Sequence, residues 1–266
     1  MNRRESLMLL AAAGSASAGA AASREIVGST IDPLLTHIRI RGHRDGRLVY
    51  YGYEGTFYGQ RSGQRTVPLL HIEGASAGAF VRQSDNSWLY NLREAGWMCD
   101  LASGAVLSSW INPLNGKTLT PRHYKSRQSS LFTGSSVKPV SADLPAGLEM
   151  QGNITRPVII RDDIWTAEEL LVRVPPNQAG GAAVVQTSLA TLHANLRDLQ
   201  RGADAWVPAT LAYQTLQSWP AWMEMATEMP GVISWRLMGR KCASVDELPN
   251  QVRARIQEQH PEVFKW

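Results

Sequence analysis

Cysteine is scarce in this sequence, which has only Cys99 and Cys242 among 266 residues. Neither cysteine has a partner at metal-ligand spacing, and the sequence contains no Cys-x-x-Cys, His-x-x-x-His or Gly-x-Gly-x-x-Gly motif. We therefore expect neither a metal nor a cofactor. Each cysteine lies in an apolar, strand-like run, so the sequence is compatible with one disulfide and equally with two buried free thiols.

Concentrated charge and long apolar runs are also missing. The 27 Lys and Arg residues and 23 Asp and Glu residues give a net charge of +4, and the basic residues form no run or stripe. Since nucleic-acid binding needs a basic surface that follows the phosphates, nucleic acid is not an expected partner. No apolar run reaches the roughly 20 residues of a spanning helix, so no membrane span is expected. The sequence indicates no oligomeric state.

The first 22 residues differ in composition from the rest. Arg3 and Arg4 precede the apolar stretch 7–13, and small residues follow through Ala22. This order of positive, apolar and small residues is typical of an export signal. NRRESLMLL resembles a twin-arginine signal, with Ser6 where that pattern usually has a bulky apolar residue. We therefore expect export to the periplasm and a single mature domain over residues 23–266.

Short strand-like runs dominate the mature sequence. Asp45-Gly46 lies between two runs rich in Ile, Val and Tyr, which predicts a hairpin over residues 38–58. Gly, Pro and Asn separate most of the later runs, which are TVPLLHIEG, GAFVRQ, SWLYNLREAGWMCDL, AVLSSWI, KTLTPRHYK, RPVIIRDDIW and ELLVRV. This pattern predicts a mainly β fold: an antiparallel, closed or nearly closed β-barrel, calycin-like in outline.

Two later segments have helical features. Residues 184–199 carry leucines at helical spacing, but the first half alternates as a strand does, and we favour a strand there. Ser244-Val245-Asp246-Glu247 has the pattern of a capping box, which predicts a C-terminal helix that begins there and ends before Pro261. Pro249 would lie in its first turn, where the missing amide costs nothing.

Nine tryptophans are more than a core of aliphatic strands needs. In SWPAWMEM, Trp219 and Trp222 flank Pro220, with Met223 beside them. Such side chains are suited to lining an apolar cavity for a flat or irregular ligand, although plain core packing explains any single tryptophan as well.

Three segments resemble a bacterial and fungal family known as the domain of unknown function numbered 1838. These segments are CDLASGAVLSSWINPLNG, DDIW, and SWPAWMEM followed by GVISWRLMGRK. The similarity extends over about residues 38–264. After Pro113, where the family pattern has an aromatic residue and an acid, this sequence has Leu114-Asn115-Gly116-Lys117. The resemblance implies relatives but no established activity.

Proton-active side chains gather after the Asn115-Gly116 turn. His123 and Tyr124 point to opposite faces of a strand, and Trp110 and Asn112 share a face of the preceding one. A lysine or tyrosine in an apolar barrel has its pKa moved by desolvation, which can give a cofactor-free site its base. We list as catalytic candidates His123, Tyr124, Lys241 and Tyr53, and as ligand-binding candidates Trp110, Asn112, Trp219, Trp222, Met223 and Arg93.

Two function hypotheses follow. In the first, the barrel holds a small hydrophobic or aromatic molecule and acts as a cofactor-independent lyase or isomerase through Tyr, His or Lys. In the second, it is a non-catalytic carrier or sensor of a lipophilic molecule. An enzyme should bring two or more candidate side chains to one point of a cavity, whereas a carrier should have an apolar lining. GASAG at residues 74–78 fits the letters of a nucleophile elbow, but the strand-rich surroundings do not suit one.

Overall fold

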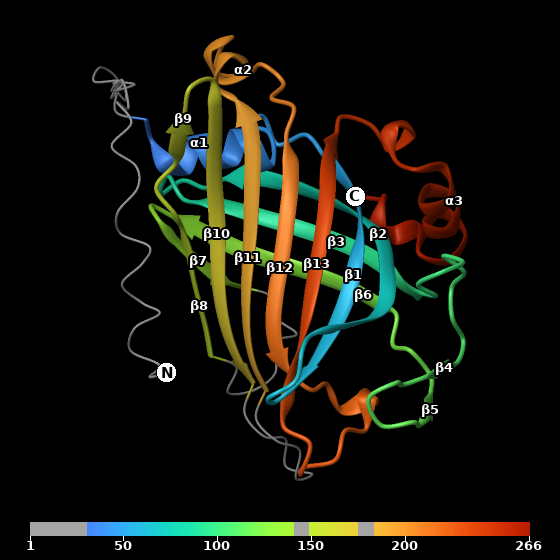
Figure 1. The fold of residues 1–266 in the computed structure, drawn as a ribbon. Helices are drawn as coiled ribbons and strands as arrows, with labels where there is room; N and C mark the ends of the chain where they lie inside the picture. Colours follow the sequence, from blue (N-terminus) through green and yellow to red (C-terminus); the bar gives the residue numbers. More distant parts are fainter. Residues whose placement is uncertain (1–30, 141–148, 175–183) are drawn as a thin grey trace, which may run out of the picture. The chain divides into compact units, whose positions relative to one another are not determined.

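The computed structural model describes residues 31–140, 149–174 and 184–266. The predicted export signal, residues 1–22, lies outside the described residues. Residues from Asp32 to Trp266 form one compact unit. In it, ten antiparallel strands close into a barrel (Figure 1), so the predicted fold is confirmed.

The barrel is a meander that closes on itself. Its order is β1, β2, β3, β6, β7, β8, β10, β11, β12 and β13, and β13 pairs with β1. The bounds of these strands are β1 (Val49–Arg61), β2 (Val67–Arg82), β3 (Trp88–Cys99), β6 (Tyr124–Thr133), β7 (Ser136–Pro139), β8 (Glu149–Ile154), β10 (Asp163–Val174), β11 (Val184–Asn195), β12 (Thr210–Ser218) and β13 (Gly231–Cys242). β11 confirms the strand expected for the first half of residues 184–199, and the short helix α2 (Leu196–Gln200) follows it. β9 (Val158–Ile160) adds a short pairing to β10.

The expected hairpin over residues 38–58 is wrong in its first strand: residues 38–41 belong to the helix α1 (Pro33–Arg41), and the strand that follows begins only at Val49. The Asp32 side chain accepts hydrogen bonds from the Leu34 and Leu35 amides at 2.9 and 3.1 Å. Together with Pro33 at the first helical position, this cap starts a helix in a segment whose Ile residues favour a strand. Asp45-Gly46 is instead the turn into β1, with Gly46 at a φ of 82°.

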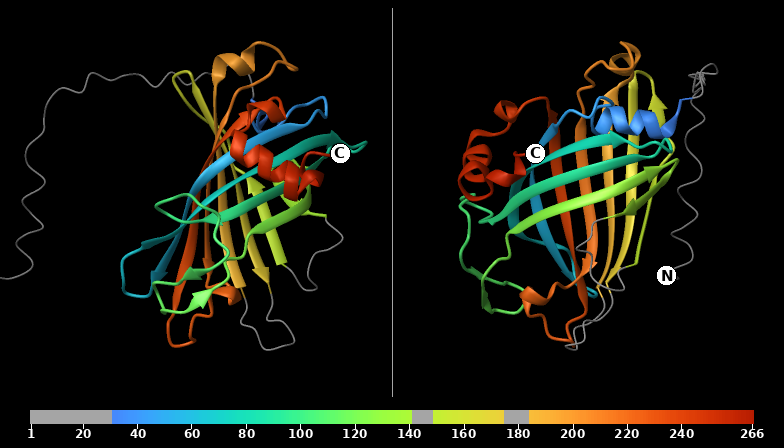
Figure 2. Two further views of the ribbon diagram at one scale, coloured as in Figure 1. Left: turned by 90° about the vertical axis from the view of Figure 1, so that its right-hand side faces the viewer. Right: turned by 180° about the vertical axis from the view of Figure 1, so that it is seen from behind.

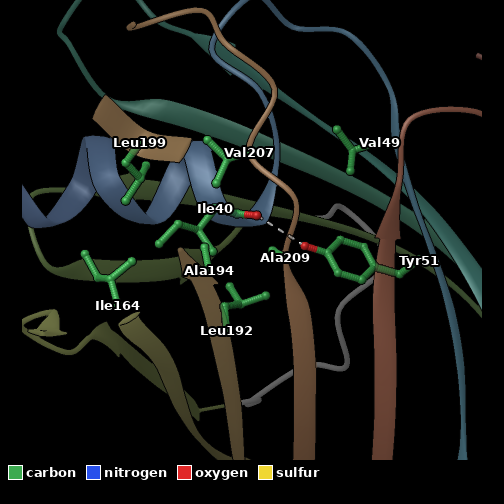
Figure 3. Close-up of a cluster of buried hydrophobic side chains, with 9 residues drawn as sticks. All are labelled: Ile40, Val49, Tyr51, Ile164, Leu192, Ala194, Leu199, Val207 and Ala209. Atoms are coloured by element: carbon green, nitrogen blue, oxygen red, sulfur yellow. Dashed lines mark hydrogen bonds between the residues drawn. The ribbon is translucent and has the colours of Figure 1, made fainter. Parts of the chain in front are cut away.

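α1 lies across one end of the barrel (Figure 2). Its Ile38 and Ile40 are fully buried. Figure 3 shows Ile40 packed among inward-facing residues of the strands and residues of the α2–β12 connection. The Tyr51 hydroxyl also donates to the Ile40 carbonyl at 3.4 Å and to the Arg41 carbonyl at 3.0 Å. This end of the barrel is therefore closed by a well-packed plug.

The opposite end carries the excursion between β3 and β6. It forms the two-stranded sheet of β4 (Trp110–Ile111) and β5 (Thr118–Leu119), and it packs against the 3-10 turn η1 (Ala221–Met223) between β12 and β13 (Figure 1). Trp222 reaches from η1 to Phe57, with ring centroids 6.0 Å apart.

The C-terminal helix exists but begins later than expected. Residues from Val245 to Glu247 form a 3-10 turn, η2, and α3 runs over Asn250–Gln259. Leu248 has an extended ψ of 153°, because the residue before a proline avoids the helical region. Pro249 therefore separates the two turns. α3 and the last turn, η3 (Pro261–Val263), cover the outer face of β2 and β3.

Cys99 and Cys242 are both buried free thiols. Among the described residues, no helix has the length and apolar character needed to cross a membrane.

Candidate functional site

The barrel encloses a cavity of about 290 Å³. Because side chains alternate between the two faces of a strand, each strand contributes every second residue to it. The lining combines leucines with a large set of polar groups. Its members are Arg41, Tyr51, Tyr53, Ser76, Tyr90, Leu92, Glu94, Tyr124, Gln128, Ser130, Glu168, Leu170, Gln186, Ser188, Ala190, Leu192, Leu211, Tyr213, Thr215, Gln217, Trp235 and Leu237.

Glycines in β2 and β3 make room for the cavity tyrosines. Gly74 and Gly96 are cross-strand partners. A Cβ atom on Gly96 would lie 2.5 Å from Cε1 of Tyr124, and one on Gly74 would lie 2.7 Å from the Tyr53 hydroxyl oxygen. Gly78 relates to Tyr90 in the same way. The GASAG segment therefore provides two of the glycines that leave space for a tyrosine ring, and it lies within a strand instead of forming a nucleophile elbow.

The two hydroxyl groups of Tyr53 and Tyr124 meet over the Gly74–Gly96 pair. Tyr124 donates to the Tyr53 oxygen at 2.5 Å, and the rings stack with centroids 6.5 Å apart. Tyr53 in turn donates to the carbonyl of Ala95 at a longer 3.4 Å. Burial, with a contribution from the nearby Glu94 charge, raises the pKa of both phenols well above 10. Both are therefore protonated at neutral pH and act as hydrogen-bond donors.

Glu94 is the second polar feature of this wall. Its Oε1 accepts a hydrogen bond from the Ser126 hydroxyl at 2.7 Å and a longer one from Gln128 at 3.5 Å. The described residues provide no salt-bridge partner for it. Burial raises the pKa of Glu94, and the Ser126 hydrogen bond and the charge of Arg41 only partly oppose this effect. Burial therefore favours the protonated form of this carboxyl more than water does.

A buried ion pair between α1 and β10 forms part of the cavity lining. Arg41, the last residue of α1, pairs with Glu168 of β10, and its guanidinium lies 4.7 Å from the centre of the Tyr90 ring. Nε2 of His37 is 3.6 Å from Oε2 of Glu168. Burial lowers the pKa of His37, which is therefore neutral. Since Arg41 and Glu168 neutralise each other, Glu94 is the cavity carboxyl without a contacting cation.

The structure brings together two of the four catalytic candidates, Tyr53 and Tyr124. It places His123 just before β6, outside the cavity lining, where Nδ1 accepts the Met98 amide at 3.1 Å. The imidazole thus replaces a backbone partner at the point where the pairing of β3 with β6 ends. Burial lowers the pKa of His123, consistent with a neutral ring that accepts this bond.

Lys241 holds the end of α1 and is not part of the cavity lining. Its Nζ donates to the carbonyls of Arg39 at 2.9 Å and Gly42 at 2.6 Å, and it lies 4.5 Å from the centre of the Trp206 ring. Carbonyls at a helix C-terminus lack intrahelical donors, and a cation there satisfies them. The position of Lys241 is explained by this contact.

The ligand-binding candidates form two groups, neither within the cavity lining. The first joins the excursion to η1: Asn112 is fully buried and donates to the carbonyl of Met223 at 3.4 Å, while the rings of Trp110 and Trp222 lie 6.2 Å apart. Trp219 fastens the same loop, since its indole donates to the Met229 carbonyl at 2.8 Å. These motif residues pack the β3–β6 excursion against η1 at this end of the barrel.

Arg93 points outward from β3. It donates to the carbonyls of Glu262 and Lys265, and its guanidinium lies 4.9 Å from the centre of the Trp266 ring. Arg93 therefore attaches the C-terminal segment to the outside of the barrel.

The site candidates from the sequence do not include Glu94, Arg41 or Glu168. Glu94 shares a strand face with Tyr90 and Leu92, and this alternation was the available signal. Glu168 lies next to Glu169 in a segment that reads as a turn, but Glu168 is inside β10 and 5% exposed. Arg41 was hidden by the missed helix. None of the described residues form a cluster of three or more side chains suited to a metal ion.

The family described as "Protein of unknown function (DUF1838)" matches residues 46–144 and 179–265 of this chain. The chain belongs to the DUF1838 family. Membership carries no activity with it, because the family's description names none. No curated protein matches the chain.

Among solved structures, the DUF1838 chain is compared with "Crystal structure of MucB in complex with MucA(peri)". The identity is 11% and the TM-score is 0.12, over 85% of this chain and 95% of that one. A similarity this low carries no structural or functional argument, so the function of this DUF1838 protein has to be inferred from its own cavity.

Proposed function

We propose that the protein binds a small molecule with a hydrophobic or aromatic body in the barrel cavity and converts it without a cofactor, as a lyase or isomerase. The observation that carries this proposal is the convergence of the Tyr53 and Tyr124 hydroxyls, 2.5 Å apart, on a cavity that also contains Glu94. Two proton donors and a carboxyl of raised pKa in one cavity are the elements of acid–base catalysis.

The cavity supports a ligand of modest size. Ligand sites are concave, mostly apolar and equipped with a few convergent polar groups, and their volumes begin near 300 Å³. Leu92, Leu170 and Leu237 offer apolar contacts, and the tyrosine hydroxyls offer hydrogen bonds that orient the ligand. Export to the periplasm, as the N-terminal sequence indicates, is part of the proposal.

A carrier of lipophilic molecules is the alternative, and the lining disfavours it. A carrier gains little from hydrogen-bonding groups inside its cavity, because each one loses water when an apolar ligand enters. Here Glu94, Gln128 and Ser188 face the same space as the tyrosines. Such a lining suits a ligand with polar groups at fixed positions.

The test begins with the protein purified from its native host. Mass spectrometry of the intact complex should detect a retained small molecule, and incubation of that molecule with ligand-free protein should consume it. Ala190→Trp places an indole inside the cavity and should abolish retention, because Ala190 faces inward on β11. Leu189→Trp, one residue away and 38% exposed on the outer face, is the matched control and should retain the molecule.

Equal retention by the Ala190→Trp and Leu189→Trp variants, both folded by circular dichroism, would place the ligand elsewhere and contradict the proposal. Retention without consumption would favour the carrier.

A further inference from the structure

We propose that Glu94 is the general base of this cavity and that the Tyr53–Tyr124 hydroxyl pair is its oxyanion site, so that the substrate is a carbonyl compound with an acidic C–H next to its C=O group. This inference rests on the proposed function and names its substrate class. Glu94 takes the proton from the α-carbon, and the electron pair of that C–H bond becomes the C=C bond of an enolate. The carbonyl oxygen becomes an anion held by a tyrosine hydroxyl, and Glu94 returns the proton to carbon.

The positions of the two groups fit one substrate. Tyr124 pairs with Gly96 and Ser126 pairs with Glu94, so Glu94 and Tyr124 lie on adjacent strands, on the same face and one pleat repeat apart. Diagonal neighbours of this kind have Cα atoms about 7–8 Å apart. A carbonyl oxygen and the hydrogen on the adjacent carbon are close enough to lie between two such side chains.

The hydroxyl pair has a proton to donate. Two O–H groups share one mutual hydrogen bond, which leaves one O–H for another acceptor. That O–H now reaches the Ala95 carbonyl at 3.4 Å, a long contact that an anionic oxygen would outcompete. Because Tyr124 donates to Tyr53, it also polarises the Tyr53 hydroxyl and makes it a better donor.

The surroundings keep Glu94 available as a base. Arg41 is in the same cavity but is paired with Glu168, so no salt bridge locks Glu94 in its charged form. Its contacts are the neutral Ser126 and Gln128. Burial makes this carboxyl accept a proton more readily than one in water, and the charge of Arg41 opposes this effect only in part.

Substituted phenols test the inference, because a phenolate has the shape and charge of an enolate. The probes are 4-nitrophenol, whose absorbance distinguishes the phenol from its anion, and 4-nitrotoluene, a neutral molecule of similar shape. In a buffer where free 4-nitrophenol is mostly protonated, Glu94→Gln removes the competing negative charge. This variant should bind 4-nitrophenol as the anion at least tenfold more tightly than the wild type does. Tyr53→Phe in the same background removes the hydroxyl that is free to donate and should reverse most of that gain.

Glu169→Gln, which makes the same change on the outer face next to Glu168, is the control and should bind as the wild type does. If 4-nitrotoluene binds in the cavity but Glu94→Gln gives no preference for the phenolate, the inference is overturned and the proposed function stands. If neither probe binds any variant, both are overturned.

Discussion

The substitution Gly96→Ala tests whether the cavity tyrosines need a glycine on the neighbouring strand. A glycine inside a strand normally costs about 0.5–1 kcal/mol relative to alanine, so Gly96→Ala would ordinarily stabilise the protein. Here the new Cβ would lie 2.5 Å from Cε1 of Tyr124, whereas ordinary contact begins at 3.4 Å. The ring must therefore move by roughly 0.9 Å, which is incompatible with the 2.5 Å hydroxyl contact to Tyr53.

The expected cost has two parts. Forcing an extra carbon into a packed site costs about 1–3 kcal/mol, and losing a hydrogen bond between two side chains costs about 1 kcal/mol. After the alanine gain is subtracted, Gly96→Ala should lower the free energy of unfolding by about 2 kcal/mol in urea denaturation. In a Tyr124→Ala background the same change should be close to neutral, because the ring is gone.

Two results would refute this reasoning. One is a Gly96→Ala protein as stable as the wild type. The other is a cost that persists in the Tyr124→Ala background, which would mean that the alanine disturbs the backbone and not the tyrosine.

Two further predictions concern the α1 end of the barrel. Lys241→Met leaves the carbonyls of Arg39 and Gly42 without their donor and should lower the free energy of unfolding by about 2 kcal/mol in urea denaturation. Burial and the charge of Arg39 lower the pKa of Lys241 to about 7. Above that pH the unfolded chain keeps a proton that the folded chain releases, so the stability of the wild type should rise with pH. Melting temperatures measured from about pH 7 upward should show this rise relative to the Lys241→Met variant. Glu168→Gln leaves the buried Arg41 unpaired and should cost about 3–5 kcal/mol by urea denaturation. Burial acts to raise the pKa of Glu168, but the charge of Arg41 outweighs this effect and the pKa is lowered. The extra stability of the wild type over Glu168→Gln should therefore disappear in acid denaturation, as the pH falls below the ordinary range of a glutamate and through this lowered pKa.

The barrel was predictable because its signal is local. Each strand is a short run with turn residues at its ends, and a series of such runs has few solutions other than a closed antiparallel sheet. Alternation puts Tyr51 and Tyr53 on one face of their strand, and the structure shows that this face lines the cavity. The same alternation separates Tyr124 from His123, which the structure keeps apart.

The remaining features depend on contacts between distant segments. Residues 38–41 look like a strand, and only the Asp32 cap and Pro33 make them helical. The pairing of Arg41 with Glu168 joins residues 127 positions apart, and no pattern in either segment announces it. The late start of α3 has a local signal in the sequence, since Leu248 precedes a proline and is therefore disfavoured in a helix.

The segments that resemble the family and the groups that suit catalysis lie in different parts of the molecule, and barrel geometry explains why. A cavity takes every second residue from many strands, so its chemistry leaves no contiguous motif. A loop closure concentrates its contacts in a few neighbouring residues: Asn112 both accepts the Leu114 amide at 3.0 Å and donates to the Met223 carbonyl. Substitution at Asn112 therefore changes the packing of the excursion against η1 first. A loss of activity there identifies a catalytic role only if the folded fraction and the ligand-free cavity are unchanged, whereas a loss at Glu94 with stability retained reports on the chemistry itself.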